Sequence, residues 1–251
     1  MNNLPKENIY AHTKKLKFLI SNIDEYIKIK NRKINILDFG CGNGSAISQY
    51  LIRPEVNLYG VDIHDESIDY ANRHFRSSNA IFLKEIPKNV LFDIIIYADV
   101  LEHLENPENF LKEHSKLLKD DGIILGSIPN GYGPFEIEKK LTYYLGLESL
   151  VSVLIKIKQK FKNKNSETIP YNFESGHVNF FTQKKFRDLL SKSGFQLDKI
   201  EKGGFIGAPF SDRILGKFNS FINFNIKLGN LLPLWMVSTW YFKAHKISKV
   251  L

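Results

Sequence analysis

The chain has 251 residues, a net charge of +8 and a single cysteine, Cys41. This length suits one α/β domain with insertions, and 43% apolar residues are enough for a globular core. One cysteine excludes an internal disulfide framework and is typical of a reducing compartment, which favours a cytoplasmic protein. The polar N-terminal stretch lacks the apolar core of a signal peptide. The longest uncharged stretch, between Lys227 and Lys243, is shorter than the roughly 20 residues of a membrane span.

Charge is unevenly distributed along the chain. Residues 1–138 carry 16 Lys and Arg against 20 Asp and Glu, a net charge of −4, whereas residues 139–251 carry 19 against 7, a net charge of +12. Such asymmetry indicates an anionic partner, for example a phosphorylated substrate, a nucleic acid or a membrane surface. A solvated lysine-rich face explains it equally well, so both interpretations stay open.

Apolar periodicity predicts an N-terminal helix within residues 8–30 and then alternating strands and helices. The helix is expected to pack beside the sheet or to cover a ligand cleft. Asn106 and Thr182 are predicted helix caps, and Asp121 with Gly122 is a predicted turn. Strands are predicted at 34–39, 57–61, 80–83, 93–97, 123–128, 195–200 and 240–245, and further helices at 45–52, 65–76, 107–118, 141–157 and 183–193. Alternation of this kind predicts an α/β fold with a mainly parallel sheet.

A glycine-rich loop follows the first predicted strand and its terminal acid, Asp38. Its glycines stand at alternate positions: Gly40, Gly42 and Gly44. A strand that enters such a loop and then a helix presents backbone N–H groups to a nucleotide-like ligand, and glycines let the backbone approach closely. A dinucleotide fingerprint would have its third glycine at position 45, which is Ser45. Asp62 ends the next strand, where a carboxylate can hold both hydroxyls of a ribose.

In these segments the chain resembles the class I S-adenosylmethionine-dependent methyltransferases. The loop segment ILDFGCGNG resembles their first motif, and residues 58–71 resemble the segment with the ribose acid. Residues 92–104 and 117–130 are similar to their fourth and fifth strand regions, and 176–195 to a late segment of the small-molecule branch. The resemblance implies one domain over residues 1–251, a Rossmann-like three-layer α/β sandwich. It also implies a seven-stranded, mostly parallel sheet of order 3-2-1-4-5-7-6 with strand 7 antiparallel.

The same resemblance implies S-adenosyl-L-methionine as the cofactor and assigns its binding residues. These are Asp38, Gly40, Cys41, Gly42, Gly44, Asp62, Ile63, Asp99 and Val100. Relatives usually carry an acid after the third strand that meets the adenine amino group, and here Glu85 is only the nearest candidate. Cys41 has no histidine beside it in the sequence, which favours a packing role over a catalytic thiol.

Asp99, Glu102 and His103 stand at helical positions i, i+3 and i+4 after the fourth strand. Asp99 and Glu102 could cap the turn, or His103 could act as a base for an acceptor hydroxyl. The resemblance to some quinone-precursor O-methyltransferases adds a third interpretation, a divalent metal held by all three residues. No metal is assigned at this stage, and the catalytic candidates are His103 and His177. His177 could face the acceptor or fix the neighbouring insertion.

Two segments are expected to determine the acceptor. Residues 135–175 form a lid-like insertion with an alternating lysine run, and in the family a variable lid at this position shapes the acceptor site. Residues 205–237 are aromatic and could form an apolar wall or a shallow membrane-facing surface. Together with the charge distribution they favour a small-molecule acceptor that is anionic, lipid-linked or sugar-linked.

The sequence therefore predicts methyl transfer to such an acceptor, at an oxygen. Ser45 counts against the alternative of an NAD-dependent oxidoreductase, while a catalytically inactive cofactor-binding scaffold stays open. A nucleic-acid methyltransferase is disfavoured, because Ala98, Asp99 and Val100 stand where amino-methylating members have an Asn/Asp-Pro-Pro-aromatic motif. Peripheral contact with a membrane and the oligomeric state are not decided.

Overall fold

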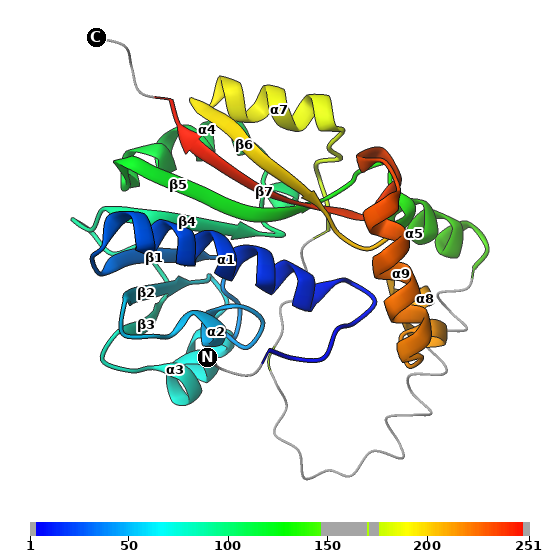
Figure 1. Cartoon of the computed structure of the whole chain (residues 1–251), viewed down its shortest axis with the longest axis horizontal. Coiled ribbons are helices and arrows are strands. Elements are labelled where there is room, and N and C mark those ends of the chain that lie inside the picture. The colour runs from blue at the N-terminus through cyan, green and yellow to red at the C-terminus, as the bar shows by residue number, and fades with distance from the viewer. Residues whose placement is uncertain (1–3, 147–169, 171–175, 248–251) are drawn as a thin grey trace.

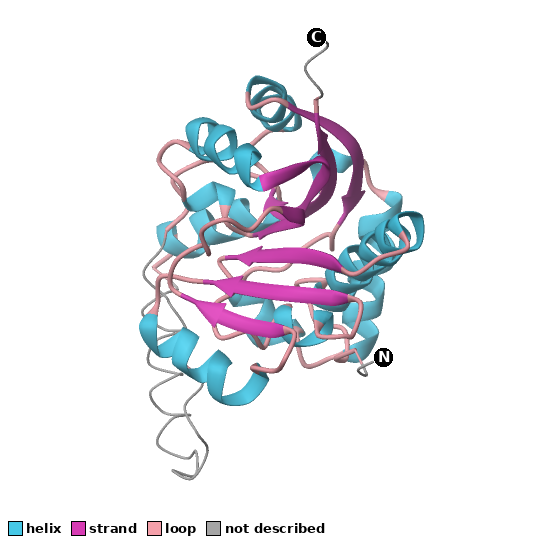
Figure 2. Ribbon diagram, turned by 90° about the vertical axis from the view of Figure 1, so that its left-hand side faces the viewer, coloured by secondary structure: helices cyan, strands magenta, loops and turns pink. Residues whose placement is uncertain are grey.

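The computed structural model describes residues 4–146, 170 and 176–247. One seven-stranded sheet of order β3-β2-β1-β4-β5-β7-β6 forms its centre. β7 runs antiparallel to both of its neighbours, and the remaining pairs are parallel. Helices cover both faces of the sheet, which gives three layers (Figures 1 and 2). The predicted fold class and strand order are confirmed.

All seven predicted strands are present. They are β1 (Ile34–Phe39), β2 (Val56–Val61), β3 (Ala80–Leu83), β4 (Phe92–Ala98), β5 (Leu118–Pro129), β6 (Phe195–Lys202) and β7 (Thr239–Lys246). The turn predicted at Asp121 and Gly122 is wrong, because β5 continues through both residues. The register between β4 and β5 shifts between Phe92 and Ile94 instead, so a bulge rather than a turn accommodates this polar stretch.

The helices are α1 (His12–Lys30), α2 (Ser48–Leu51), α3 (Asp65–Phe75), α4 (Pro107–His114), α5 (Pro134–Tyr144), α7 (Gln183–Lys192), α8 (Pro209–Leu215) and α9 (Asn219–Leu231), with 3₁₀ turns η1 (Leu101–His103), η2 (Ser115–Leu117) and η3 (Leu234–Met236). The helices predicted up to residue 118 and at 183–193 are present with other lengths, whereas α5 begins before the helix predicted at 141–157, and α8 and α9 were not predicted. Both predicted caps are confirmed: the Asn106 side chain accepts from the Asn109 N–H, and Thr182 accepts from that of Lys185. The helix predicted at 45–52 is a single turn, because the glycine-rich loop extends to its start.

The core has two apolar layers, one on each face of the sheet. Ile94 and Ile96 of β4 pack with α1, α2 and α3, whereas Ile95 and Tyr97 pack with α4 and α7. Successive side chains of a strand point to opposite faces, so a strand buried on both faces reads as a continuous apolar run. This explains why β4, with the sequence FDIIIYA, could be predicted as a central strand.

The two segments expected to shape the acceptor site are described in part. The lysine run and most of the helix predicted at 141–157 lie outside the described residues, whereas α5 belongs to the first part of the insertion. Residues 205–237 form α8, α9 and η3 near α5 (Figure 1). The buried Asn225 amide donates to the carbonyls of Ile9 and Ile206 and accepts from the Ile206 N–H, which ties α9 to the N-terminal loop. No helix in the described part of the chain is long and apolar enough to cross a membrane.

Candidate active site

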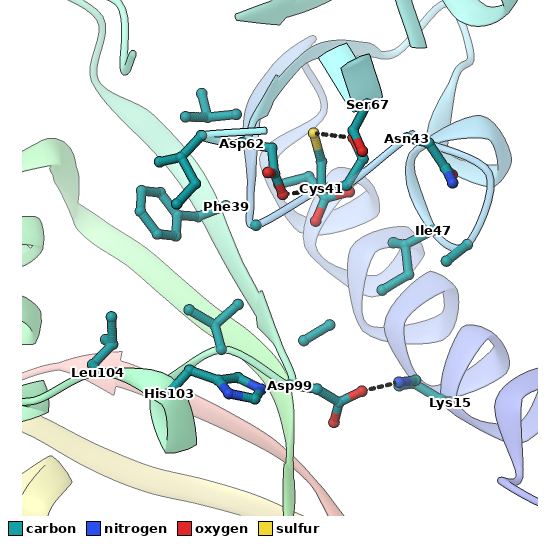
Figure 3. A pocket seen from close by; sticks show the side chains of 18 of the residues that line it. Lys15, Phe39, Cys41, Asn43, Ile47, Asp62, Ser67, Asp99, His103 and Leu104 are labelled. Atoms are coloured by element: carbon teal, nitrogen blue, oxygen red, sulfur yellow. Dashed lines mark hydrogen bonds and ion pairs between the residues drawn. The ribbon is translucent and has the colours of Figure 1, made fainter. Parts of the chain in front are cut away.

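A cleft of about 840 Å³ opens at the carboxyl ends of β1, β2 and β4 (Figure 3). We call it the glycine-loop cleft, because the loop after β1 forms one wall. Most of the residues predicted to bind the cofactor line it: Asp38, Gly40, Cys41, Gly42, Asp62, Ile63, Asp99 and Val100. The carboxyl edge of a parallel sheet is where open α/β folds bind their ligands.

The loop is held in an open curve by the neighbouring strand. The N–H groups of Gly40 and Cys41 donate to the Val61 carbonyl at 2.8 and 3.0 Å. Gly40 has φ +74°, and a Cβ there would lie 2.8 Å from Cγ2 of Val100. Gly42 has φ +53°, and no atom lies within 4 Å of the position its Cβ would take. The absence of a side chain at Gly42 therefore leaves space for a ligand rather than for another part of the protein.

Gly44 is the member of the predicted set that does not line the cleft. A Cβ on Gly44 would meet the rings of Phe75 and Phe82 at 3.1 and 3.2 Å. Its φ of +75° is also one that side chains rarely adopt. Gly44 thus serves the packing of the loop against α3 and β3.

The two acids at the ends of β1 and β2 have different surroundings. Asp62 accepts from the Gly42 N–H at 2.8 Å and from the His64 N–H at 2.9 Å, one bond at each carboxylate oxygen. A carboxylate has about four lone-pair sites, so Asp62 retains acceptor capacity toward the cleft. Asp38 is buried and accepts from the Ser48 hydroxyl at 2.5 Å. Burial raises the pKa of Asp38 to about 6, although the Ser48 hydrogen bond opposes this.

The N-terminal segment contributes site residues that were not predicted individually, among them Tyr10, His12 and Lys15. Figure 3 shows the ion pair between Lys15 and Asp99, in which Lys15 Nζ lies 2.5 Å from Oδ2. The Ser127 hydroxyl donates to Oδ1 of Asp99 at 2.7 Å. The proposed cap at Asp99 and Glu102 is wrong, because no side chain caps η1 and both Asp99 oxygens are used elsewhere.

A second cavity, of about 590 Å³, adjoins the first. We call it the histidine cavity. Its apolar lining includes Ile9, Tyr10, Pro129, Phe135, Ile206 and Pro209, and its polar lining is formed by Lys15, Asp99, Glu102, His103, His177, Ser238 and Thr239. Four residues line both cavities: Tyr10, Lys15, Asp99 and His103. A group bound in one cavity would therefore lie beside a group bound in the other.

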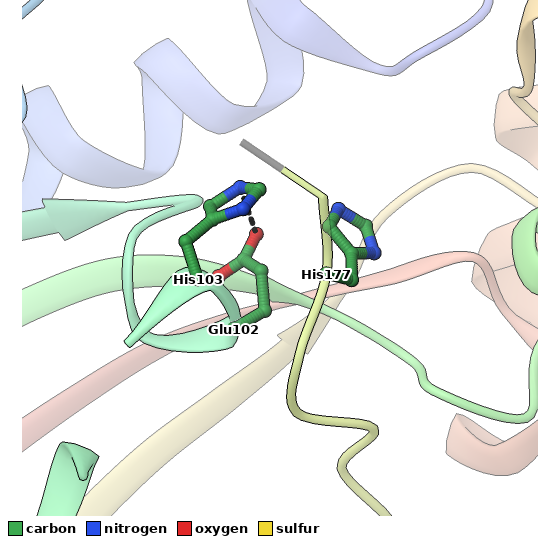
Figure 4. Close-up of side chains that lie close together, drawn as sticks. All are labelled: Glu102, His103 and His177. Carbon is green, nitrogen blue, oxygen red and sulfur yellow. Dashed lines mark ion pairs between the residues drawn. The ribbon is translucent and has the colours of Figure 1, made fainter. Parts of the chain in front are cut away.

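Glu102, His103 and His177 come together in the histidine cavity (Figure 4). One donor atom from each lies within 4.8 Å of the others, close enough to hold a metal ion, and the two imidazole rings meet edge to face at 5.0 Å. Glu102 is fully buried, and burial raises its pKa well above the usual value. Neither of its carboxyl oxygens has a hydrogen-bond partner among the described residues. Asp99, which shared the predicted helical face, points instead to Lys15.

Each of the two histidines is oriented by a hydrogen bond at Nδ1. In His103 this nitrogen donates to the Gly176 carbonyl at 3.0 Å, and in His177 it lies 2.6 Å from Oε1 of the buried Glu136. Burial lowers the pKa of His103 despite its bond to Gly176. The ring of Phe135 also stacks on His177 at 5.7 Å. Both predicted catalytic histidines thus lie in one cavity, although they are far apart in the sequence.

A family model described as a methyltransferase domain matches residues 10–200, more than half of the chain. The chain belongs to this methyltransferase-domain family. A ubiquinone biosynthesis O-methyltransferase of Pelagibacter ubique is 29% identical over 124 residues, covering 44% of this chain and 50% of the relative. The mitochondrial ubiquinone biosynthesis O-methyltransferase of Bos taurus is 25% identical over 190 residues, covering 71% of this chain and 45% of the relative. The chain spans about half the length of the curated relatives it matches.

Solved structures have the same fold as this methyltransferase-domain protein. The magnesium protoporphyrin IX methyltransferase of Synechocystis, solved with S-adenosyl-L-homocysteine, has a TM-score of 0.53 at 15% identity over 95% of this chain and 85% of that one. An O-methyltransferase from a polyketide synthase multienzyme of Brevibacillus brevis was solved in complex with the same ligand. It has a TM-score of 0.54 at 18% identity, over 94% of this chain and 72% of that one. At these identities the comparison establishes the fold alone.

Proposed function

We propose that this methyltransferase-domain protein binds S-adenosyl-L-methionine in the glycine-loop cleft and transfers its methyl group to a hydroxyl oxygen of a small molecule in the histidine cavity. The observation that carries the proposal is the wall shared by the two cavities, which contains Lys15, Asp99 and His103. Donor and acceptor held on either side of this wall would be adjacent, and methyl transfer depends chiefly on such positioning. Membership of the family and the O-methyltransferase names of the relatives support the reaction type.

The residues of the glycine-loop cleft fit this cofactor. The open space at Gly42 leaves room for the cofactor beside the loop. The unused lone pairs of Asp62 can accept hydrogen bonds from both ribose hydroxyls. Ile63, which is 82% exposed, offers an apolar surface to the adenine, with Glu85 at the same end of the cleft. At the other end, Lys15 and Asp99 complement the carboxylate and the ammonium of the methionine portion.

When bound, S-adenosyl-L-methionine supplies a methyl group on a positively charged sulfur. The protein has to align the acceptor oxygen with that carbon and to accept the hydroxyl proton. His103 and His177 are the side chains placed to assist this proton removal, because both line the histidine cavity. As the oxygen–carbon bond forms, the carbon–sulfur bond breaks and its electron pair remains on sulfur.

The lining of the histidine cavity indicates an acceptor with an apolar body and a hydroxyl at one end. The apolar side chains lie on the N-terminal loop, the end of β5, α5, the segment before α8 and the first residue of α8. Of the acids and histidines, Asp99 and His103 belong to the shared wall, and Glu102 and His177 lie close to His103. A mostly apolar pocket with a few convergent polar groups is typical of small-molecule sites, because the polar groups fix the orientation.

We propose further that the acceptor is anionic or lipid-linked and is reached from the cytoplasmic surface of a membrane. Arg213, Lys217 and Lys227 belong to the same stretch of the chain as the exposed apolar residues of α8, α9, η3 and the turn between α8 and α9, and Asp212 is the sole acid in residues 205–247. We call this the α8–α9 surface; its exposed apolar members are Ile214, Phe218, Phe224, Leu231 and Trp235. It adjoins the histidine cavity, because Pro209 at the start of α8 lines that cavity. Apolar and basic side chains together suit an anionic lipid surface.

The proposal is tested by incubating the purified protein with methyl-labelled S-adenosylmethionine and fractionated metabolite and lipid extracts, followed by mass-resolved detection of products. Label in a hydroxyl-bearing small molecule is expected, and its loss in Asp62→Ala would connect it to the glycine-loop cleft. Cofactor binding without transfer to any fraction would indicate an inactive scaffold. Tighter binding of NAD than of S-adenosylmethionine in calorimetry would overturn the assignment in favour of an oxidoreductase.

A further inference from the structure

We propose that a hollow between α1, the end of β6 and the end of α9 is a binding site for a phosphate group (Figure 1). The hollow has a volume of about 250 Å³ and is lined by Lys14, Ile200, Glu201, Lys202, Asn230 and Leu234. Whole small molecules occupy pockets of roughly 300–1,000 Å³, so this one suits a single group of a larger ligand. We call it the lysine hollow. It shares no lining residue with the glycine-loop cleft or the histidine cavity.

Two ammonium groups of the lysine hollow converge on Asn230. Lys14 Nζ donates to the Asn230 side-chain oxygen at 2.5 Å and to the Gly203 carbonyl at 3.2 Å. Lys202 Nζ donates to the backbone carbonyls of Asn230 and Leu232, both at 2.7 Å. An ammonium has three N–H groups, so each lysine retains one donor for a ligand.

The two positive charges are not neutralised within the hollow. All four partner oxygens are uncharged, and neither lysine forms an ion pair with a carboxylate in the described part of the chain. The Glu201 carboxylate also lines the hollow, but it pairs with Lys199 at 2.7 Å. Burial lowers the pKa of Lys14 and the charge of Lys202 adds to this effect, although Glu201 and Glu7 oppose it. An anion between the two lysines would offset their repulsion.

Capping of α9 explains only one of the two lysines. Lys202 bonds to carbonyls at the end of this helix, as cations near helix C-termini commonly do. Lys14 belongs to α1 and bonds to the side chain of Asn230 and to the carbonyl that follows β6. Since a second ammonium beside Lys202 is unfavourable for capping alone, its placement favours an anion site.

The donors and their surroundings indicate the chemistry of the anion. Lysine binds phosphate as a point charge, whereas planar carboxylates are matched best by the fork of arginine. Leu231 and Trp235 of the α8–α9 surface directly follow Asn230 and Leu234, and they are 82% and 65% exposed. A phosphate in the hollow would therefore have apolar side chains beside it, which suits a phosphorylated amphiphile. A lipid headgroup and a soluble phosphorylated molecule share this chemistry.

Calorimetric titration of the full chain with inorganic phosphate and with glycerol 3-phosphate, at constant low ionic strength, measures binding. NMR spectra of the ¹⁵N-labelled chain locate the site through the backbone N–H signals of Gly203 and Asn230. We expect both phosphates to bind and to shift these signals. This result does not depend on the proposed methyl transfer, so the two proposals can fail separately.

Vesicles identify the source of the phosphate. Phosphatidylcholine vesicles that contain phosphatidic acid are compared with vesicles that carry the same charge as phosphatidylglycerol. Tighter binding to phosphatidic acid, which exposes a phosphate monoester, would assign a lipid headgroup. Binding of the soluble phosphates without this preference would assign a soluble ligand. If neither soluble phosphate shifts the Gly203 and Asn230 signals and phosphatidic acid is not preferred, the inference is overturned.

Two variants test the assignment of the donors. Lys14→Met with Lys202→Met keeps the apolar stems and should weaken glycerol 3-phosphate by about tenfold or more, because two charge-assisted hydrogen bonds are lost. Asn230→Asp keeps the oxygen that accepts from Lys14 and adds a negative charge between the lysines. This variant should stay folded and lose phosphate binding.

The matched control is Lys28→Met with Lys185→Met, which lowers the net charge equally at two exposed lysines. Lys28 lies on α1 about 21 Å along the helix from Lys14. Thermal unfolding establishes that each variant is folded. A folded Asn230→Asp variant that binds glycerol 3-phosphate as tightly as the wild type contradicts the site, as does equal weakening in the control. Phosphate binding by a protein that transfers no methyl group would overturn the proposed function and leave this site intact.

Discussion

The ammonium of Lys15 lies 2.5 Å from a carboxylate oxygen of Asp99, and this contact joins α1 to the end of β4 across the wall between the two cavities. Asp99 has φ +57°, an uncommon backbone conformation for a residue other than glycine, and the bonds from Lys15 and Ser127 help to hold it. The pair is therefore placed to respond to a ligand in either cavity.

Lys15→Met should weaken S-adenosylmethionine binding by about 10- to 100-fold, because a charge-assisted hydrogen bond to the methionine carboxylate is worth about 1.5–3 kcal/mol. Calorimetry measures the affinity directly. The neighbouring Lys14→Met is the matched control, since Lys14 bonds to the Gly203 carbonyl and to Asn230 outside the cleft. Equal affinities for the wild type and Lys15→Met would contradict the placement of the methionine portion at Lys15.

Alanine substitutions at Gly42 and Gly44 should separate ligand binding from packing. Both positions have positive φ, so each variant should lose more than about 1 kcal/mol of stability. Gly44→Ala should lose more, because its Cβ meets Phe75 and Phe82, whereas Gly42→Ala should chiefly weaken cofactor binding. Urea unfolding and calorimetry on the two variants check this. A folded Gly44→Ala with lower cofactor affinity than Gly42→Ala would reverse the two roles.

Much of the fold could be predicted because the central strands are apolar on both sides and end in recognisable polar residues. β4 illustrates this, since its continuous apolar run requires layers above and below. The turn expected at Asp121 and Gly122 fails for a tertiary reason: β5 pairs with β4 at Leu118 and again from Ile123, where its pairing with β7 also begins, so the stretch between them becomes a bulge within the strand.

The site could be predicted only where its residues share one local segment. Asp38 lies near the end of β1 and Asp62 directly follows β2, so their position at the ligand edge follows from the topology. The residues that contact His177 could not be predicted from the sheet topology. Its contacts to Glu136 and His103 join α5, η1 and the segment before α7, and a sequence pattern contains no distance between such segments. For the same reason, no sequence pattern indicated Lys15 as a residue of the site.

His114 should make stability depend on pH below neutrality. Burial lowers the pKa of His114 to about 4 from its ordinary value of 6.5, and its ring contacts the Tyr97 hydroxyl at 3.0 Å and the Phe110 ring. Between these pH values the unfolded chain binds a proton at this position and the folded chain does not. The stability contributed by neutral His114 is therefore complete above pH 6.5 and is lost as the pH falls toward 4.

Urea unfolding of the wild type and His114→Gln at pH 7 and pH 5 tests this linkage. The variant should lose less stability on acidification than the wild type. Asp38, whose pKa is raised to about 6, acts in the opposite direction, but it is present in both proteins and cancels in the comparison. His245→Gln, at an exposed pair with Asp198, serves as the control. Identical acid dependence in the wild type and His114→Gln would contradict the prediction.

The α8–α9 surface should bind anionic vesicles in preference to neutral ones. Phe224 and Leu231 are 56% and 82% exposed on α9, and Lys227 lies between them in the sequence. Each lysine near an anionic surface contributes about 1 kcal/mol, and salt screens this attraction, whereas the apolar side chains add a contribution that salt does not weaken. Co-sedimentation with phosphatidylcholine vesicles, with and without phosphatidylglycerol, should therefore show binding that high salt reduces but does not abolish.

Two variants identify the contacting side chains. Phe224→Ser with Leu231→Ser should reduce binding at high salt, where the apolar contribution dominates, and Lys217→Gln with Lys227→Gln should reduce it at low salt. Ile29→Ser, at a comparably exposed apolar residue on α1, is the control and should bind as the wild type does. If the wild type sediments with neither kind of vesicle, the membrane contact is wrong. A soluble acceptor such as a nucleotide-linked sugar then becomes the better hypothesis, because the basic residues near the histidine cavity would still attract its phosphates.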